Sequence, residues 1–394
     1  MIPLVGPEFG SYPAGDVTWL LKDLSAVALE APTEEREAAV QAGTAHYAES
    51  LPIEYQPSAE YQDLFRAALA DSADRVAHAV GVVTELVLAR AGRTAGAGSA
   101  GAGSAGGTPV LVSLARAGTP IGILMRRWAA AVHGLDLPHY TVSIVRGRGI
   151  DRLALRWLAA RHAPSDVAFV DGWTGKGAIT RELAAAVAGV ARDDGLQFDP
   201  ALAVLADPGG CVPLFGTRDD FLIPSACLNS TVSGLVSRTV LNDAYIGSDD
   251  FHGAKYYREL TPSDVSMIFI DAICARFPAV ADRVAADWPR LAAGGGEPDW
   301  RGWRACDEVA ARYGITDVNL VKPGVGETTR VLLRRVPWKV LIRAGSADLA
   351  HVLLLARQRG VDVVDVPDLP YSCVGLIRPG YSGAAGPLQA AAAP

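Results

Sequence analysis

One short stretch combines residue types that could bind an anion. In VAFVDGWTGKGAIT (167–180), four apolar residues end on Asp171, and three glycines, two threonines and Lys176 follow. Backbone N–H groups of a glycine turn at a helix start bind anions, and a lysine adds positive charge. Thr174 and Thr180 can donate hydroxyl hydrogen bonds to phosphate oxygens, and Asp171 can accept them from sugar hydroxyls. The stretch therefore indicates a sugar-phosphate site, and a tight packing turn is the alternative.

A second apolar segment ends in a similar way. SLARAGTPIG (113–122) runs from a predicted strand into Arg116, Ala117 and Gly118 before a predicted helix. Ligands bind at the carboxyl ends of strands in open parallel sheets. We therefore expect Arg116 and Asp171 to face one cleft.

A third segment, KPGVGETTRVLLRR (322–335), is dense in cations and contains two glycines. A chain with a net charge of −7 must concentrate its cations locally to bind an anion. We therefore predict an anion clamp near Asp171 and Arg116, made by Lys322, Gly324, Glu327, Thr328 and Arg330. A salt-bridged face around Glu327 is the alternative.

The cysteines offer a different chemistry. There are five, without a C-x-x-C pair, which argues against a disulfide framework and favours a reducing cytoplasm. IPSACLNSTV contains Cys227, and His252 follows as a candidate base for a nucleophilic thiol. A buried, unreactive cysteine is the commoner outcome. Because nothing adjacent marks Cys227 as a thiolate of low pKa, we expect Cys227→Ala to leave the main activity mostly intact.

The segments that position these residues indicate an α/β protein. Apolar runs at 109–115, 141–146, 167–171 and 202–208 alternate with helical patterns and predict a parallel sheet covered on both faces. Residues 1–92 read as a helical region that includes 16–24, and the Gly/Ala/Ser repeat within 93–108 reads as a flexible insertion. The core is expected over 109–335, a small α/β module over 336–378 and a disordered tail over 379–394.

Composition and missing motifs exclude several classes of protein. The 394 residues favour two or three domains, and no apolar run is long enough to span a membrane. The negative net charge argues against broad electrostatic binding of nucleic acid. Walker A, G-x-G-x-x-G and H-E-x-x-H motifs are absent, so a P-loop, a dinucleotide fold and a zinc site are not expected.

The two strand-end loops resemble those of type I phosphoribosyltransferases, in which such loops bind ribose 5-phosphate and pyrophosphate. The sequence departs from that pattern because Asp171 is followed by Gly172 rather than a second acid. More closely, the chain resembles the phosphoribosyltransferase-like family called stress-induced cysteine protease, StiP, found with tellurite-resistance (Ter) stress genes. SYPAGDVTWLLKDL, DFLIPSACLNSTVSGLVSRTVLN and VKPGVGETTRVLLRRVPWKVLI carry this resemblance. The C-terminal segment, to about residue 378, is similar to a Pelota-type RNA-binding domain.

The resemblance implies a glycosyltransferase that moves a phosphoribosyl group from phosphoribosyl pyrophosphate to a small acceptor, such as a precursor of a nucleoside-like metabolite. Asp171, Arg116 and Lys176 would be catalytic. The donor would be bound by Arg116, Ala117, Gly118, Asp171, Thr174, Gly175, Lys176, Gly177 and Thr180. Magnesium would be held by Asp171 and Asp207, since hard oxygen ligands suit it. The alternatives are a cysteine protease using Cys227 and His252, and a non-catalytic nucleotide- or RNA-binding stress protein. An oligomer is expected. RNA is a less well supported partner, because the charges of the C-terminal module nearly balance.

Overall fold

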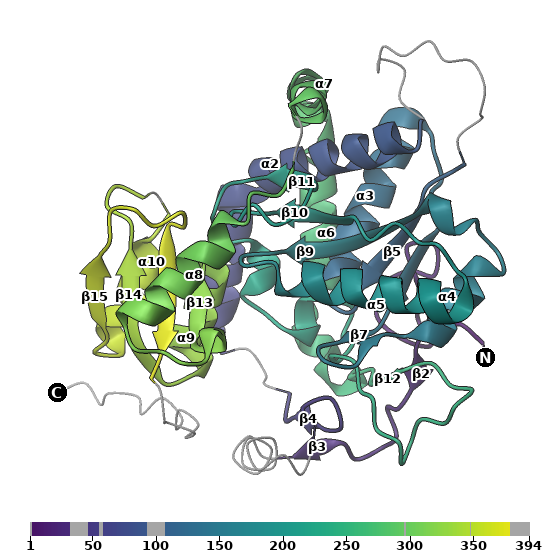
Figure 1. Cartoon of the computed structure of the whole chain (residues 1–394), viewed down its shortest axis with the longest axis horizontal. Coiled ribbons are helices and arrows are strands. Elements are labelled where there is room, and N and C mark those ends of the chain that lie inside the picture. The colour runs from purple at the N-terminus through teal and green to yellow at the C-terminus, as the bar shows by residue number, and fades with distance from the viewer. Residues whose placement is uncertain are drawn as a thin grey trace.

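The computed structural model describes residues 2–31, 46–54, 58–92, 107–294, 297–346 and 348–378 (Figure 1). The tail expected over 379–394 and nearly all of the insertion expected over 93–108 lie outside these residues.

A six-stranded parallel sheet forms the centre of the larger domain. Its order is β1 (Thr18–Trp19), β6 (His139–Val142), β5 (Val110–Leu114), β9 (Val167–Trp173), β10 (Leu202–Ala206) and β11 (Leu214–Thr217). Every adjacent pair is parallel. Strands β5 and β10 are buried along their whole length, as the continuous apolar runs predicted.

Helices cover both faces of this sheet, as Figure 1 shows for α2 and α3 on one side and α4 and α5 on the other. The bounds are α2 (Ala59–Arg90), α3 (Gly118–His133), α4 (Arg152–Ala159), α5 (Ala178–Asp194), α6 (Ser266–Cys274) and α7 (Phe277–Ala293). Alternate side chains of a strand point to opposite faces. Leu111 accordingly packs in the core with α2 and α3, whereas Val110 and Val112 pack in the core with α4 and α5.

The N-terminal region is only partly helical. Within the helical region expected over 1–92, α2 is a long helix that ends at Arg90. The helix expected over 16–24 is wrong, because this segment forms β1 and β2 (Lys22–Asp23). Leu20 and Leu21 lie in different cores on opposite sides of the chain, which an extended backbone allows and one face of a helix does not.

Short strands and 3₁₀ turns complete the larger domain. Strand β2 pairs with β12 (Gly253–Ala254), β3 (Glu30–Ala31) with β4 (Leu51–Pro52), and β7 (Ile144–Val145) with β8 (Gly149–Ile150). The turns are η1 (Pro164–Asp166), η2 (Pro224–Ala226), η3 (Ser230–Val232) and η4 (Arg258–Ser263).

A second sheet forms the C-terminal domain, at the left of Figure 1. Its order is β13 (Val321–Pro323), β16 (Cys373–Ile377), β14 (Pro337–Ile342) and β15 (Asp362–Asp365). Helices α8 (Arg301–Arg312), α9 (Val325–Arg334) and α10 (Ala350–Gln358) and the turn η5 (Val318–Leu320) accompany it. The boundary expected at 335/336 is therefore misplaced, because it cuts β13 and α9 away from the sheet on which they pack. Among the described residues, none of the helices is both long and apolar enough to cross a membrane.

Candidate functional site

A cleft lies at the carboxyl ends of β5 and β9, where the two domains meet. It consists of two adjoining cavities of about 170 and 460 Å³. The residues that line both cavities are Arg116, Ala117, Asp171, Asn229, Glu327 and Arg330. The structure thus brings the two strand ends together with two residues of α9, Glu327 and Arg330, that follow them by a long stretch of chain.

The two cavities differ in chemistry. The smaller one, which we call the apolar half, is lined by Trp173, Phe221, Ile223, Leu228 and Val232 in addition to the shared residues. The larger one, which we call the cationic half, adds Lys322, Val331 and Arg335.

Asp171 is a carboxyl group that titrates near neutral pH. Burial raises its pKa to about 7, against the opposing effects of the Gly172 N–H and the Arg330 charge. The Gly172 N–H donates to Asp171 Oδ1 at 2.7 Å. Although part of the residue reaches the cleft surface, its carboxyl group is shielded well enough to hold or release a proton around pH 7.

Arg116 is held in place by the larger domain. Its Nη1 donates to the Val236 carbonyl at 3.1 Å and lies 3.6 Å from Glu54 Oε1. Glu54 in turn accepts hydrogen bonds from the backbone N–H and hydroxyl of Ser230, at 3.0 and 2.7 Å. Glu54 is not predictable from the sequence, because it lies in a short irregular segment with no motif.

Helix α9 contributes an ion pair to the cleft. Arg330 Nη1 contacts Glu327 Oε1 at 3.0 Å, and Arg330 Nε donates to the Ala226 carbonyl at 3.3 Å. Burial opposes ionisation of Glu327, but the charges of Arg330 and Lys322 outweigh it and lower the pKa of Glu327. Of the other two residues expected in the clamp, Thr328 is fully buried, and Gly324 has a positive φ of 86° at the start of α9. The salt-bridged alternative thus describes Glu327 and Arg330, yet both still line the cleft.

The glycine loop after β9 is covered rather than open. Tyr371 of the C-terminal domain donates its hydroxyl to the Gly175 carbonyl at 2.6 Å. Lys176 Nζ donates to the carbonyls of Val318 and Val321, and burial lowers the pKa of Lys176 to about 8. A Cβ on Gly175 would lie 2.3 Å from the Trp173 ring. The loop is therefore a packing junction between the domains.

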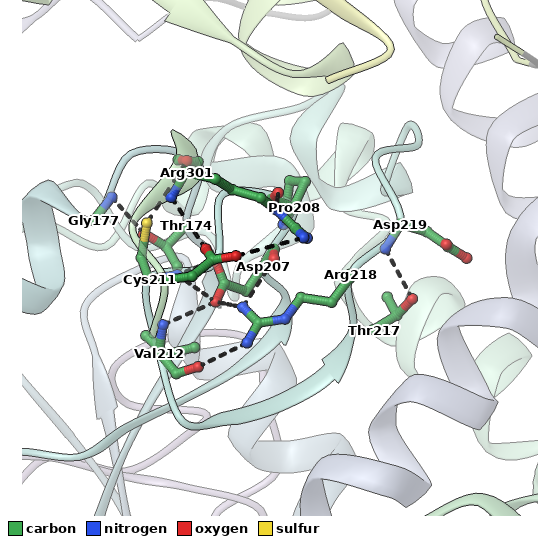
Figure 2. A network of polar contacts seen from close by, with 12 residues as sticks. Thr174, Gly177, Asp207, Pro208, Cys211, Val212, Thr217, Arg218, Asp219 and Arg301 are labelled. Atoms are coloured by element: carbon green, nitrogen blue, oxygen red, sulfur yellow. Dashed lines mark hydrogen bonds and ion pairs between the residues drawn. The ribbon is translucent and has the colours of Figure 1, made fainter. Parts of the chain in front are cut away.

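The threonines of this loop do not reach the cleft either. Thr174 is buried and its Oγ1 accepts from the Gly177 N–H at 3.2 Å (Figure 2). Thr180 Oγ1 is buried and has no hydrogen-bond partner among the described residues. Neither cavity of the cleft is lined by Thr174, Gly175, Lys176, Gly177 or Thr180.

Asp207 is committed to its own turn, as Figure 2 shows. Its carboxylate accepts the N–H groups of Cys211 at 2.7 Å and Val212 at 2.9 Å and forms an ion pair with Arg218. The side chain is fully buried and lines neither cavity. These contacts fit a carboxylate surrounded by N–H donors and do not fit a magnesium ligand, which leaves only Asp171 of the expected pair. In the part of the chain that the structure describes, no group of three or more His, Cys, Asp or Glu side chains could hold a metal ion.

Cys227 and His252 belong to different places in the fold. Cys227 follows η2 and is 1% exposed, within the core under the cleft. His252 Nδ1 is hydrogen-bonded to Ser143 Oγ at 2.8 Å, and its backbone N–H is bound by Asp151. Of the five cysteines, only Cys274 is partly exposed, and burial raises the pKa of its thiol. The residues on either side of Cys227, Ala226 and Leu228, do line the apolar half of the cleft.

Comparison with known proteins defines the family. Residues 10–274 match the family model described as "Tellurite-like stress resistance cysteine protease StiP", and residues 300–379 match that of the "PELOTA RNA binding domain". The chain belongs to the StiP family and carries a C-terminal PELOTA domain. It is 32% identical over 381 residues to "Cysteine protease StiP" of Acinetobacter baylyi, which covers 94% of both chains. No solved structure matches the chain.

These similarities correct the transferase interpretation. The family model and the relative are both named for a cysteine protease, which is a hydrolase, so the assignment as a glycosyltransferase is wrong. Phosphoribosyl pyrophosphate and a small acceptor are wrong as partners for the same reason. The mixed α/β fold with a parallel sheet stands, whereas no solved relative supports a type I phosphoribosyltransferase fold.

Proposed function

We propose that the protein is a cysteine peptidase of the StiP type, with Cys227 as its nucleophile. The observation that carries the proposal is that the turn bearing Cys227 forms one wall of the cleft, in a chain similar along almost its whole length to a protein named cysteine protease. Cys227 itself lines neither cavity, but both of its neighbours in the chain line the cleft, which is not so for the other buried cysteines, Cys211, Cys306 and Cys373.

The reaction would follow the usual course of thiol-dependent acyl transfer. The Cys227 thiol gives its proton to a base, and the thiolate attacks the peptide carbonyl carbon. The tetrahedral intermediate expels the amine, which takes up the proton, and water then hydrolyses the thioester. No histidine lines either cavity, so we assign the role of base to Asp171, whose pKa of about 7 suits proton transfer at neutral pH.

The buried thiol sets a condition on this mechanism. With Cys227 only 1% exposed, the turn η2 must rotate before the sulfur can reach a substrate in the apolar half. We infer that substrate binding between Ala226 and Asp171 opens this turn. The proposed mechanism thus requires this turn to move. It also requires a reduced thiol, which favours a cytoplasmic location.

The test compares two cysteine substitutions in a peptide-library cleavage assay. We expect Cys227→Ser to lower kcat/KM at least about a thousandfold, because an alcohol without a stronger base replaces the thiolate. The control, Cys274→Ser, removes the one partly exposed thiol and is expected to retain activity. Equal activity of the two variants, or no peptidase activity in the wild type under reducing conditions, overturns the proposal. The loss of activity expected for Cys227→Ser is the opposite of the outcome that the sequence alone predicted for Cys227→Ala.

RNA binding by the C-terminal domain is a second candidate, favoured by the PELOTA match over residues 300–379. Arg357 is exposed on α10, and Lys339 pairs with Asp362 at the neighbouring strand. Fluorescence anisotropy with single-stranded RNA at low and high salt tests the idea. Binding that weakens steeply with salt and with Arg357→Gln supports it.

A further inference from the structure

The cationic half of the cleft holds a lysine, Lys322, whose only acidic influence comes from Glu327, which is itself paired with Arg330. Lys322 Nζ makes no hydrogen bond or ion pair with any residue that the structure describes. Burial lowers the pKa of Lys322, and the nearby charges of Arg335, Arg146 and Arg330 lower it further against the opposing effect of Glu327. An ammonium group taken partly out of water without a partner is unfavourable, so an anion that reaches it gains an interaction that the protein alone leaves unmade.

Other cations surround the same space. Lys322 lies on β13, Arg330 on α9, and Arg335 directly after α9, while Arg116 faces them from the larger domain. Two acids share this cavity, and one of them, Glu327, is already paired with Arg330. Arg116 also lies 3.6 Å from Glu54 Oε1, so four cations face three acids, and the cavity carries a small excess of positive charge in a chain whose net charge is −7. Such local concentration is what anion recognition requires against an opposing global field.

The apolar half adds a second requirement. Its aromatic and aliphatic walls enclose about 170 Å³ next to Asp171 and Arg116, which both halves share. A pocket of this kind accepts an apolar group, and the few polar groups at its edge set the orientation of the ligand. A ligand that fills both halves must carry an apolar group beside an anionic one.

We propose that the cleft binds peptides in which an apolar side chain fills the apolar half and a neighbouring carboxylate binds Lys322 and Arg330 in the cationic half. This inference rests on the proposed peptidase function and names its substrate class. The carboxylate comes either from an acidic side chain or from the end of a peptide chain, because both present the same group to the two cations. Guanidinium and ammonium donors to a carboxylate form charge-assisted hydrogen bonds, the stronger class.

The experiment measures binding without turnover. Full-length protein carrying Cys227→Ala is titrated with two pairs of fluorescein-labelled peptides. The first pair contains Leu-Glu or Leu-Gln, and both of its peptides have amidated ends. The second pair ends on Leu, either as a free carboxylate or as an amide. We expect each carboxylate-bearing peptide that fits to bind about tenfold or more tightly than its neutral counterpart. The pair that shows the preference identifies the source of the carboxylate. Equal affinity within both pairs overturns the inference.

Two lysine variants locate the preference. Lys322→Gln is expected to reduce the ratio of the affinities for each carboxylate peptide and its neutral counterpart about tenfold or more. The matched control is Lys339→Gln, because Lys339 lies on β14 of the same domain and pairs with Asp362 outside the cleft. Equal effects of the two variants would show a general charge effect and overturn the inference. Displacement of the acidic peptide by single-stranded RNA, with loss of RNA binding in Lys322→Gln, would also overturn it.

Cleavage assays in the wild-type protein separate this inference from the proposed function. Selective binding of carboxylate peptides without any cleavage contradicts the peptidase but supports the inference. Cleavage of acidic and neutral peptides with equal kcat/KM supports the peptidase and overturns the inference.

Discussion

At the residue scale, the cleft contains charged groups placed where ionisation is unfavourable. Asp171 and Lys322 illustrate this, since burial moves the pKa of the carboxyl up and that of the ammonium down. Groups of this kind concentrate at functional sites, because the surrounding fold must offset their desolvation. Each can be tested by removing its charge.

Asp171→Asn should change how stability depends on pH. The folded-state pKa of about 7 lies above the ordinary value of 3.8, so the folded protein binds a proton that the unfolded chain has lost between these values. This contribution to stability is fully present below about pH 4 and is lost as pH rises through about 7. We expect the free energy of unfolding of the wild type to fall relative to that of Asp171→Asn across this window. Urea unfolding at several pH values measures it, and parallel pH profiles would contradict it.

Lys322→Met should stabilise the protein while impairing its cleft. The methionine keeps much of the side-chain volume and removes an ammonium whose burial disfavours its charge more than the attraction of Glu327 favours it. We expect the free energy of unfolding to rise by about 0.5–2 kcal/mol, the usual gain from a single stabilising substitution. Denaturant unfolding measures the change. A loss of stability would show that Lys322 supports the fold rather than a ligand.

At the element scale, α8 begins in direct contact with the glycine loop. A Cβ on Gly302 would lie 2.2 Å from Tyr371 Oη, 2.4 Å from the Gly175 carbonyl oxygen and 2.5 Å from Gly209 Cα. Two of these neighbours are backbone atoms that cannot rotate away. The absence of a side chain at residue 302 therefore lets the C-terminal domain cover the loop after β9.

Gly302→Ala should destabilise the protein by about 1–3 kcal/mol, the usual effect of overpacking. Gly189→Ala is the matched control, because residue 189 lies within α5 and its added Cβ would approach only Arg192, at 3.8 Å. That control should gain about 0.5–1 kcal/mol from the higher helix propensity of alanine. Thermal and denaturant unfolding of both variants measures the difference, and equal changes would refute the close-packing argument.

At the scale of the whole molecule, Asp220 connects the two domains. Its Oδ1 accepts the Val325 N–H at the start of α9 and its Oδ2 accepts the Ser372 N–H, both at 2.8 Å. The Ser372 hydroxyl also donates to the Asp220 carbonyl at 3.0 Å. Burial raises the pKa of Asp220 to about 6 in spite of these N–H donors. One side chain of the larger domain thus positions the helix that carries Glu327 and Arg330.

Asp220→Ala should loosen the C-terminal domain and with it the cleft. Two buried N–H groups lose a carboxylate acceptor, which is expected to lower stability by about 1.5–3 kcal/mol. We expect earlier proteolytic cleavage between the domains and a second transition in unfolding curves. Asp365→Ala, at an exposed position of β15, is the control and should leave both unchanged. A single, unshifted transition in Asp220→Ala would contradict the role of this contact.

The local sequence determined much of the larger domain. Continuous apolar runs predicted β5, β9 and β10, because a strand buried on both faces needs apolar residues at every position. The same composition misled the prediction over residues 16–24, since Trp19, Leu20 and Leu21 suit a buried helix and an edge strand equally well. The presence of Asp171, Arg116 and Arg330 at one cleft was also predictable, from parallel-strand geometry and from the need to concentrate positive charge.

Only the tertiary structure decided which polar residues remain available to a ligand. The loop around Gly175 and Lys176 has the composition of an anion site, but Tyr371 and the carbonyls of η5 and β13 occupy its hydrogen-bonding groups. Asp207 likewise resembles a free acid at the end of a strand until the N–H groups of its own turn and Arg218 surround it. The type of a residue shows whether its side chain can make a hydrogen bond. Whether a distant segment already makes that bond depends on long-range packing, which leaves no local pattern in the chain.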